Sequence, residues 1–452
     1  MEAGQIQSQP DTTARHRVGL EEGWWQERVP AWSRVDAATF HDHAWQLRNG
    51  VSRPSDLVPL VGDLVPDGFM DDLAAGLRIA PMCIRLTPYV LSLVDWTDPG
   101  PDPIRRQFVP LASEIEPDHP RCSLDALEEQ RDSVLPGLVH RYPDKVLFLA
   151  LQVCPVYCRF CTRSYAVGKD TGAVEKCSLG AGRDRWERTF EWIENHRGVE
   201  DVVVSGGDTW LLSSAMIRRI GERLLATAHV RRIRFASKGL AVLPQKILSD
   251  PEWLDVLAHL ASEGRQRGVQ VALHTHFNHP REITSVTRRA AQMLFERGIV
   301  VRNQSVLQRG VNDEPGCMTR LVRGLSRIQV QPYYVYVHDL VPGVECLRTS
   351  LAEALDLERA VRGQTAGFNT PTFVCDTIGG GGKRDAHSFE HYDRRLGIAV
   401  FRSPVVDPER PFFHFDPMRT LDRSVQAAWR CDRTQQEMIH SVLDQAGFGW
   451  SH

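Results

Sequence analysis

Three cysteines in a CxxxCxxC spacing, Cys154, Cys158 and Cys161, are the clearest candidates for chemistry in this sequence. They follow the apolar run KVLFLALQV, which predicts a buried strand. Structural zinc takes four closed ligands, usually in CxxC pairs, and no fourth Cys or His lies nearby in the sequence. Three thiolates instead suit a [4Fe–4S] cluster with one iron open to a small ligand. We predict such a cluster, with zinc as the alternative.

Two glycine-rich segments are weaker candidates. SGGD ends the next apolar run, where Gly206 and Gly207 would let the backbone approach a ligand, although most such pairs are simple turns. GGGGK, which ends at Lys383, is not a Walker loop, because Thr377 and Arg384 occupy the positions that need Gly and Ser or Thr. A lysine on bare glycines has room for a planar partner, and lysine is the usual anchor of pyridoxal phosphate. Composition alone would favour a solvated surface lysine.

The elements that position these residues alternate in type. Amphipathic stretches such as RWERTFEWIENH, SAMIRRIGERLLATA and TSVTRRAAQMLFERG separate most of six short apolar runs, a pattern that predicts βαβ units and a parallel sheet. The six runs are KVLFLALQV, VEDVVVSGG, VRRIRFASKG, VQVALHTHF, IVVRNQSVL and VQPYYVYVHDL.

Polar residues follow nearly every one of these runs. A doubly wound sheet would gather such groups at one switch point, whereas a barrel brings all strand ends to one mouth. Their spread over all six runs favours a partial (β/α)6 barrel. The groups are the three cysteines, Ser205 to Asp208, Ser237 and Lys238, His274 to His276, Asn303 to Ser305, and His338 with Asp339.

Composition limits the other function classes. The 452 residues are 42% hydrophobic and 25% charged with a net charge of −3, which is typical of a globular protein without an electrostatic footprint for nucleic acid or membrane. The N-terminus lacks an apolar signal core, and no apolar run approaches the ~18 residues of a membrane span. We therefore expect a cytoplasmic protein. Residues 1–140 should form a mostly helical region, residues 141–345 the barrel, and residues 346–452 a C-terminal region that carries Lys383.

The ordered motifs resemble the lysine 2,3-aminomutase family of radical S-adenosylmethionine enzymes, whose fold is a TIM-type barrel. The resemblance covers roughly residues 40 to 390 and implies a [4Fe–4S] cluster, S-adenosylmethionine, pyridoxal phosphate and an external electron donor. The motifs are HRYPDKVLFL, CxxxCxxCTR, DVVVSGGD, HTHFNHPREIT, NQSVLQRGVND, QPYYVYVHDL and GGGGK, with DHAWQLRN and DPIRRQ before them.

The resemblance also implies roles for individual residues. Lys383 would be the catalytic lysine that anchors pyridoxal phosphate, with Arg141 and Tyr142 gripping its phosphate. Arg163 would hold the substrate carboxylate, and Asp339 and Asp376 its cationic end. Taken without the family, the two aspartates could be turn or cap residues. The residues implied to bind S-adenosylmethionine are Gly206, Gly207, Asp208, His276 and Gln304.

The implied activity moves the 2-amino group of a cationic amino acid, lysine before arginine, to carbon 3. Another radical outcome such as deamination, or an iron–sulfur electron-transfer protein, remains an alternative. An electron-transfer protein would not need Lys383 on four glycines, and long extensions disfavour a protein-modifying relative. The family prototype's C-terminal CxCxxC zinc motif is missing, since only Cys431 lies near the end. Intersubunit zinc is therefore not expected, and a homo-oligomer stays open.

Overall fold

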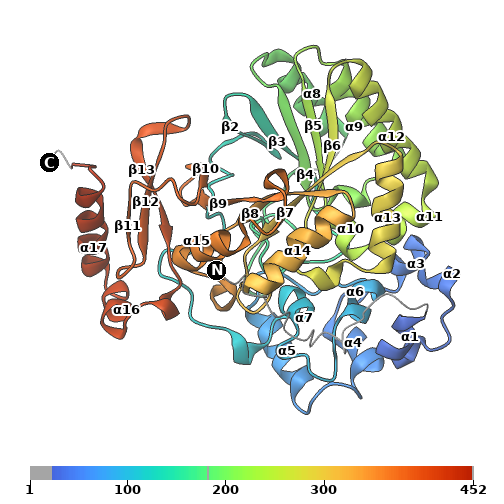
Figure 1. Ribbon diagram of the computed structural model, residues 1–452, viewed down its shortest axis with the longest axis horizontal. Coiled ribbons are helices and arrows are strands. Elements are labelled where there is room, and N and C mark those ends of the chain that lie inside the picture. Colours follow the sequence, from blue (N-terminus) through green and yellow to red (C-terminus); the bar gives the residue numbers. More distant parts are fainter. Residues whose placement is uncertain (1–22, 181–182, 450–452) are drawn as a thin grey trace, which may run out of the picture.

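A computed structural model describes residues 23–180 and 183–449 (Figure 1). Its centre is a ten-stranded sheet in which the strands lie side by side in chain order. Seven successive strands pair in parallel, which confirms the predicted α/β architecture with a parallel sheet. These strands are β3 (Lys145–Leu151), β4 (Asp201–Gly206), β5 (Arg232–Ala236), β6 (Gln270–Thr275), β7 (Val300–Val306), β8 (Val330–Tyr336) and β9 (Thr372–Thr377).

Helices connect the parallel strands, as their amphipathic patterns predict. In α9 the residues Ile217, Ile220 and Leu224 recur at helical spacing and are buried, while Met216 and Arg218 face solvent. The connecting helices are α8 (Arg183–Asn195), α9 (Ser214–Ala226), α10 (Gly239–Val242), α11 (Gln245–Ser249), α12 (Pro251–Gln266), α13 (Ser285–Glu296), α14 (Pro315–Arg327) and α15 (Leu351–Val361). No helix in the described part of the chain is long and apolar enough to span a bilayer.

The sheet extends beyond the six predicted strands at both edges. The antiparallel strands β1 (Ser133–Leu135) and β2 (Leu138–Tyr142) precede β3. At the other edge, the parallel strand β9 pairs with the antiparallel strand β10 (Gly382–Asp385). The sheet therefore continues past the boundary expected at residue 345, and the segment that carries Lys383 is part of it.

The N-terminal region is helical, as predicted, and lies beneath the barrel in Figure 1. Its aromatic residues form much of its core, and the rings of Trp25 and Phe40 stack with centroids 4.3 Å apart. The first 22 residues of the expected region lie outside the described residues. The helices are α1 (Trp24–Arg28), α2 (Ala37–Phe40), α3 (His43–Arg48), α4 (Pro54–Val61), α5 (Phe69–Ile79), α6 (Pro88–Leu93) and α7 (Pro103–Phe108).

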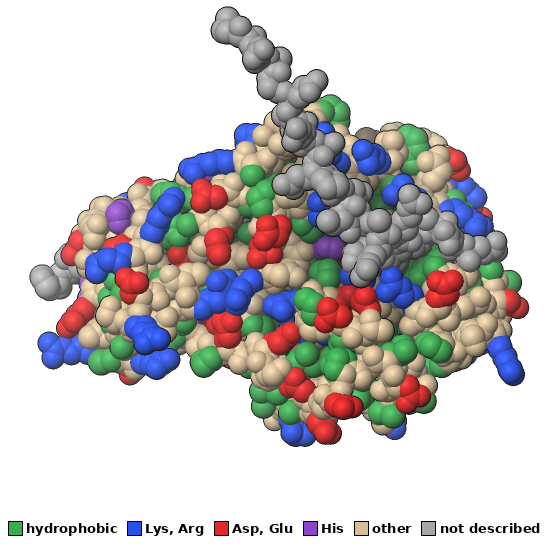
Figure 2. All heavy atoms as spheres, turned by 60° about the horizontal axis from the view of Figure 1, so that its bottom comes forward, with side chains coloured by type: hydrophobic (Ala, Val, Ile, Leu, Met, Phe, Trp, Pro, Cys, Tyr) green, Lys and Arg blue, Asp and Glu red, His purple; other side chains and the backbone are tan. Residues whose placement is uncertain are grey.

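The C-terminal region forms a small unit at the side of the barrel (Figure 1). A separate antiparallel sheet consists of β11 (His391–Asp393), β12 (Ile398–Ser403) and β13 (Asp407–Phe415), covered by α16 (Arg423–Trp429) and α17 (Asp432–Gln445). This unit has its own apolar cluster, which includes Val400, Phe415 and Trp429. Charged side chains of both signs are mixed over the face of the molecule shown in Figure 2.

Candidate active site

The cysteine loop follows the end of β3, where the sequence places it. All three side chains are partly buried, and burial raises the pKa of Cys158 to about 12 and raises those of Cys154 and Cys161 as well. The metal-free thiols are therefore protonated, and bound iron would stabilise the thiolates. Among the described residues, no three His, Cys, Asp or Glu side chains are arranged around a single ion. A [4Fe–4S] cluster does not require its three cysteines to surround a single ion, because each thiolate binds a different iron.

A fourth cysteine that is distant in sequence packs near this loop. Cys83, from the N-terminal region, joins Cys154 and Cys161 around the buried side chains of Met82 and Tyr157. The sequence gives no sign that Cys83 lies near this loop, because 71 positions separate it from Cys154. The N-terminal region thus supports the outer side of the cysteine loop directly.

The SGGD turn after β4 packs against the start of the same loop. The amides of Gly207 and Asp208 donate to the carbonyls of Leu151 and Val153 at 2.6 and 2.9 Å. A Cβ on Gly206 or Gly207 would overlap that backbone, and Gly206 has a φ of +113°. The glycines are therefore required for strand-end packing, whatever ligand they contact. Both carboxylate oxygens of Asp208 accept backbone amides, so this side chain caps the turn.

His276 and Gln304 both lie near the mouth of the barrel. Burial lowers the pKa of His276 to about 3, which keeps its ring neutral, and the ring contacts Asn278 at 3.1 Å. Gln304 lies 3.3 Å from His274 Nδ1. The other ring nitrogen of His274 and the hydroxyl of Thr275 are buried without a hydrogen-bond partner in the described chain. Such groups are available to a polar ligand at the strand ends.

Lys383 and Asp376 face each other across the β9–β10 pair. They are register partners, and Lys383 Nζ donates to Asp376 Oδ2 at 2.9 Å. Burial alone would lower the pKa of Lys383, but Asp376 raises it well above the usual value. The ring of Tyr336, on β8, lies 5.4 Å from Nζ. The sequence identified Lys383 but gave no sign that Asp376 would be its partner.

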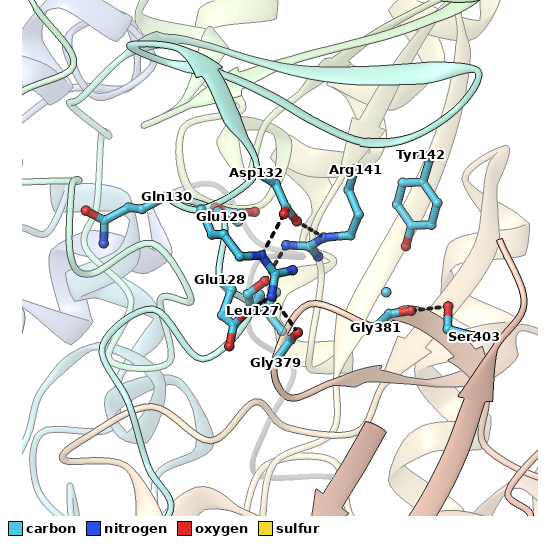
Figure 3. Close-up of polar contacts among 12 residues, drawn as sticks. Leu127, Glu128, Glu129, Gln130, Asp132, Arg141, Tyr142, Gly379, Gly381 and Ser403 are labelled. Atoms are coloured by element: carbon cyan, nitrogen blue, oxygen red, sulfur yellow. Dashed lines mark hydrogen bonds and ion pairs between the residues drawn. The ribbon is translucent and has the colours of Figure 1, made fainter. Parts of the chain in front are cut away.

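Arg141 and Tyr142 lie at the end of β2, beside the glycine loop (Figure 3). The hydroxyl of Tyr142 accepts the backbone amide of Lys383 at 2.8 Å, and a Cβ on Gly382 would overlap this hydroxyl. Arg141 Nε donates to Asp132 at 2.6 Å. A second arginine, Arg131, donates to the other oxygen of Asp132 at 3.0 Å and to the Gly379 carbonyl at 3.3 Å. Arg131 is therefore an additional guanidinium group at the loop, beside the one that the sequence predicted.

Two carboxylates of the site have buried oxygens without partners. Thr162, next to Cys161, donates its hydroxyl to Asp339 Oδ2 at 2.5 Å. Oδ1 of Asp339 and Oδ1 of Asp376 have no hydrogen-bond partner among the described residues. Burial, together with the neighbouring charge of Asp376, raises the pKa of Asp339 to about 7. The two acceptors can take hydrogen bonds from a cationic ligand, which would also relieve their mutual repulsion.

Arg163 is already paired in this structure. Its Nε and Nη2 donate to the two carboxylate oxygens of buried Glu129 at 2.9 and 2.7 Å, and Tyr165 donates to the same carboxylate at 2.9 Å. Nη1 has no hydrogen bond in the described chain and can donate to a further acceptor. Glu129 was missed by sequence reasoning, because a glutamate in the polar segment LEEQRD carries no local signal.

Curated relatives are similar in sequence to this chain over most of its length. An L-lysine 2,3-aminomutase from Acetoanaerobium sticklandii is 39% identical over 353 residues, which are 78% of this chain and 79% of that protein. The chain belongs to the lysine 2,3-aminomutase family. It is therefore an isomerase of the aminomutase class.

The chain also has two more distant likenesses. A glutamate 2,3-aminomutase from Clostridioides difficile is 28% identical over 345 residues, 76% of each chain, so the family includes enzymes named for substrates of opposite side-chain charge. A solved radical SAM methyltransferase from Sphaerobacter thermophilus is 20% identical, covers 53% of this chain and 68% of that one, and has a TM-score of 0.34. No family model matches the chain.

Proposed function

We propose that this aminomutase acts on L-lysine, moving its 2-amino group to carbon 3 to give the β-amino acid. The observation that carries the proposal is the pair of buried, partnerless oxygens on Asp339 and Asp376. Two carboxylates at one end of a buried site favour a ligand that is positively charged at that end. An acidic substrate would add a third negative charge there and is disfavoured.

The residues present fit the cofactors that this chemistry needs. Cys154, Cys158 and Cys161 would hold a [4Fe–4S] cluster, and the unpartnered groups of His274 and Thr275 favour a polar ligand beside it. Lys383 would anchor pyridoxal phosphate. When bound, the cluster and S-adenosylmethionine supply a carbon radical that removes hydrogen from C3, and pyridoxal phosphate carries the migrating nitrogen.

Asp376 changes its partner in this proposal. In the structure it pairs with the Lys383 ammonium. Lys383 would hold pyridoxal phosphate through Nζ, and Asp376 would then be available to the substrate's cationic end.

The remaining side chains bind and orient the substrate. Arg163 Nη1 would bind the substrate carboxylate while Glu129 holds the other side of the guanidinium. Asp339, held by Thr162, and Asp376 would receive the distal ammonium. Fixing both ends of the substrate selects one C–H bond for the radical, which is the positioning that such chemistry requires.

Arginine is the second candidate substrate, because its guanidinium is also cationic. Lysine is favoured since a compact ammonium can be shared by two separate carboxylates, whereas a guanidinium prefers one bidentate partner and more space. The test is anaerobic incubation of the reconstituted enzyme with lysine, arginine and glutamate in separate reactions, followed by identification of the products. A 3-amino product from lysine at the highest kcat/KM is expected. Glutamate turnover that rivals lysine would overturn the proposal.

A further inference from the structure

A small basic pocket lies on the outer side of the cysteine loop. Its volume is about 250 Å³, and its lining includes Arg48, Arg85 and Lys169 but no acidic side chain. Pro155, the residue after Cys154, forms part of the same lining. Arg48 and Lys169 are exposed, while Arg85 is half-buried. The pocket thus combines positive charge with direct contact to the segment that would hold the cluster.

Direct contacts link the pocket to the cysteine loop. The carbonyl of Arg85 accepts the amide of Tyr157 at 3.1 Å, and its guanidinium lies 6.0 Å from the centre of the Tyr157 ring. Gly168, just before Lys169, donates its amide to the carbonyl of Gln152 at 2.8 Å. Val153, next to Cys154, is 44% exposed. The cysteine loop is therefore close to solvent at its start.

The opposite side of the loop faces the interior of the barrel. Phe160, in the loop, has its ring centre 5.4 Å from that of His276 and 6.4 Å from that of His338. Lys238, near Cys158, is buried and pairs with Glu282 at 2.9 Å. In the proposed function that interior holds S-adenosylmethionine and substrate. An electron-carrying protein must therefore approach from the outer side.

We propose that this basic pocket is the docking site of an acidic one-electron donor protein. The proposal rests on the proposed function, in which each activation requires one electron. The donor is oxidised by one electron and the cluster is reduced by one, with no change in covalent bonds. The chain's net charge is only −3, and a local group of three cations steers an acidic partner without a basic overall surface. Carboxylates of the donor would enter the pocket and pair with its cationic side chains.

The test measures reduction of the cluster instead of turnover. Anaerobic holoenzyme is mixed in a stopped-flow instrument with a reduced plant-type [2Fe–2S] ferredoxin or with dithionite, and bleaching of the cluster absorbance is followed. The docking variants are Arg48→Glu and Lys169→Glu. The matched control is Arg433→Glu on α17, which has the same charge change at a side chain that is 86% exposed.

Each docking variant should slow bimolecular reduction by ferredoxin about tenfold or more at low salt, with a smaller effect at high salt. Dithionite, which needs no protein docking, should reduce all variants at the wild-type rate. Docking variants that behave like Arg433→Glu would overturn the proposal. Binding of inorganic phosphate in the pocket without any change in the rate of reduction by ferredoxin would also overturn the proposal, because it would assign the pocket to a small anion. Absence of the cluster absorbance from the anaerobic wild-type protein before mixing would instead refute the cluster itself.

Discussion

The two charged ends of the proposed substrate site differ in how completely their polar groups are bonded. At the arginine end, which would bind the substrate carboxylate, two nitrogens of Arg163 donate to Glu129. The Glu129 carboxylate also accepts a hydrogen bond from Tyr165. At the acidic end, Asp339 and Asp376 each keep one buried oxygen without a partner. The arginine end is thus preorganised by the protein, whereas the aspartate end becomes satisfied only when a cation arrives. We infer that the aspartate end contributes more to substrate selection.

The largest effect is expected at Asp376, which serves both Lys383 and the substrate. Asp376→Asn should lower kcat/KM for lysine about thirtyfold or more, because the Asp376 side chain is only 5% exposed and loss of its charge opposite a bound ammonium costs about 2–5 kcal/mol. Steady-state kinetics and the visible absorbance of bound pyridoxal phosphate measure the two roles separately. Asp356→Asn, in a surface pair that is 65% exposed, is the matched control and should change little. Unchanged kinetics for Asp376→Asn would remove the distinction between the two ends.

Glu129→Gln tests whether the arginine end is preorganised. The guanidinium would lose charge-assisted hydrogen bonds worth about 1.5–3 kcal/mol, so KM for lysine should rise about tenfold or more with a smaller change in kcat. Lysinamide, which lacks the carboxylate, should be affected less than lysine. Tyr165→Phe removes only a donor to Glu129 and should show a weaker form of the same effect. A fall in KM would show that Glu129 competes with the substrate instead of orienting Arg163.

The pH dependence of binding tests the acidic end directly. Asp339, with a pKa of about 7, is largely protonated below neutrality and ionised above it. A cationic substrate favours the ionised form, so its affinity should increase as pH rises through 7, by about tenfold between about pH 6 and pH 8. Kd measured for lysine by calorimetry should follow this trend. Norleucine, an uncharged analogue at that end, should not, and Asp339→Asn should abolish the dependence.

The smallest effect is expected from Thr162, which supports Asp339. Its hydrogen bond lowers the pKa of Asp339, so Thr162→Val should raise that pKa further and move the affinity profile to higher pH. At neutral pH the loss should be about 0.5–1.5 kcal/mol, or roughly two- to thirteenfold in Kd. Thr162→Ser keeps the hydroxyl and should restore the profile. A Thr162→Val profile identical to that of the wild type would exclude this support role.

The sequence predicted the parts of the fold that depend on local periodicity. The six apolar runs became β3 to β8, and the amphipathic stretches became α8, α9 and α13. The seventh parallel strand, β9, was missed, although TFVCDT is rich in strand-forming residues, because it stands apart from the strand–helix alternation before it. Motif spacing likewise located the cysteines and Lys383, since these signals are short and continuous.

Contacts between distant segments could not be predicted in this way. Arg163 and Glu129 are separated by 34 positions, and their pairing depends on how the loop before β1 folds over the barrel. Arg131 likewise carries no signal in the sequence, because its contact with the glycine loop joins segments that are far apart along the chain. The sequence named one partner of each pair, the one within a motif. The other partner lies where only tertiary packing brings it.

The glycine loop between β9 and β10 makes the small C-terminal sheet important for chemistry. Ile378, at its start, forms a bridge with Phe413, and the carbonyl of Gly381, at its end, accepts the hydroxyl of Ser403 at 2.6 Å. Both contacts anchor the loop and thereby the register in which Lys383 faces Asp376. Successive strand residues point to opposite faces, so a slip of one position would turn the lysine amine away from the site. The small C-terminal sheet contributes no reacting group, yet its contacts determine on which face of the ten-stranded sheet the Lys383 amine lies.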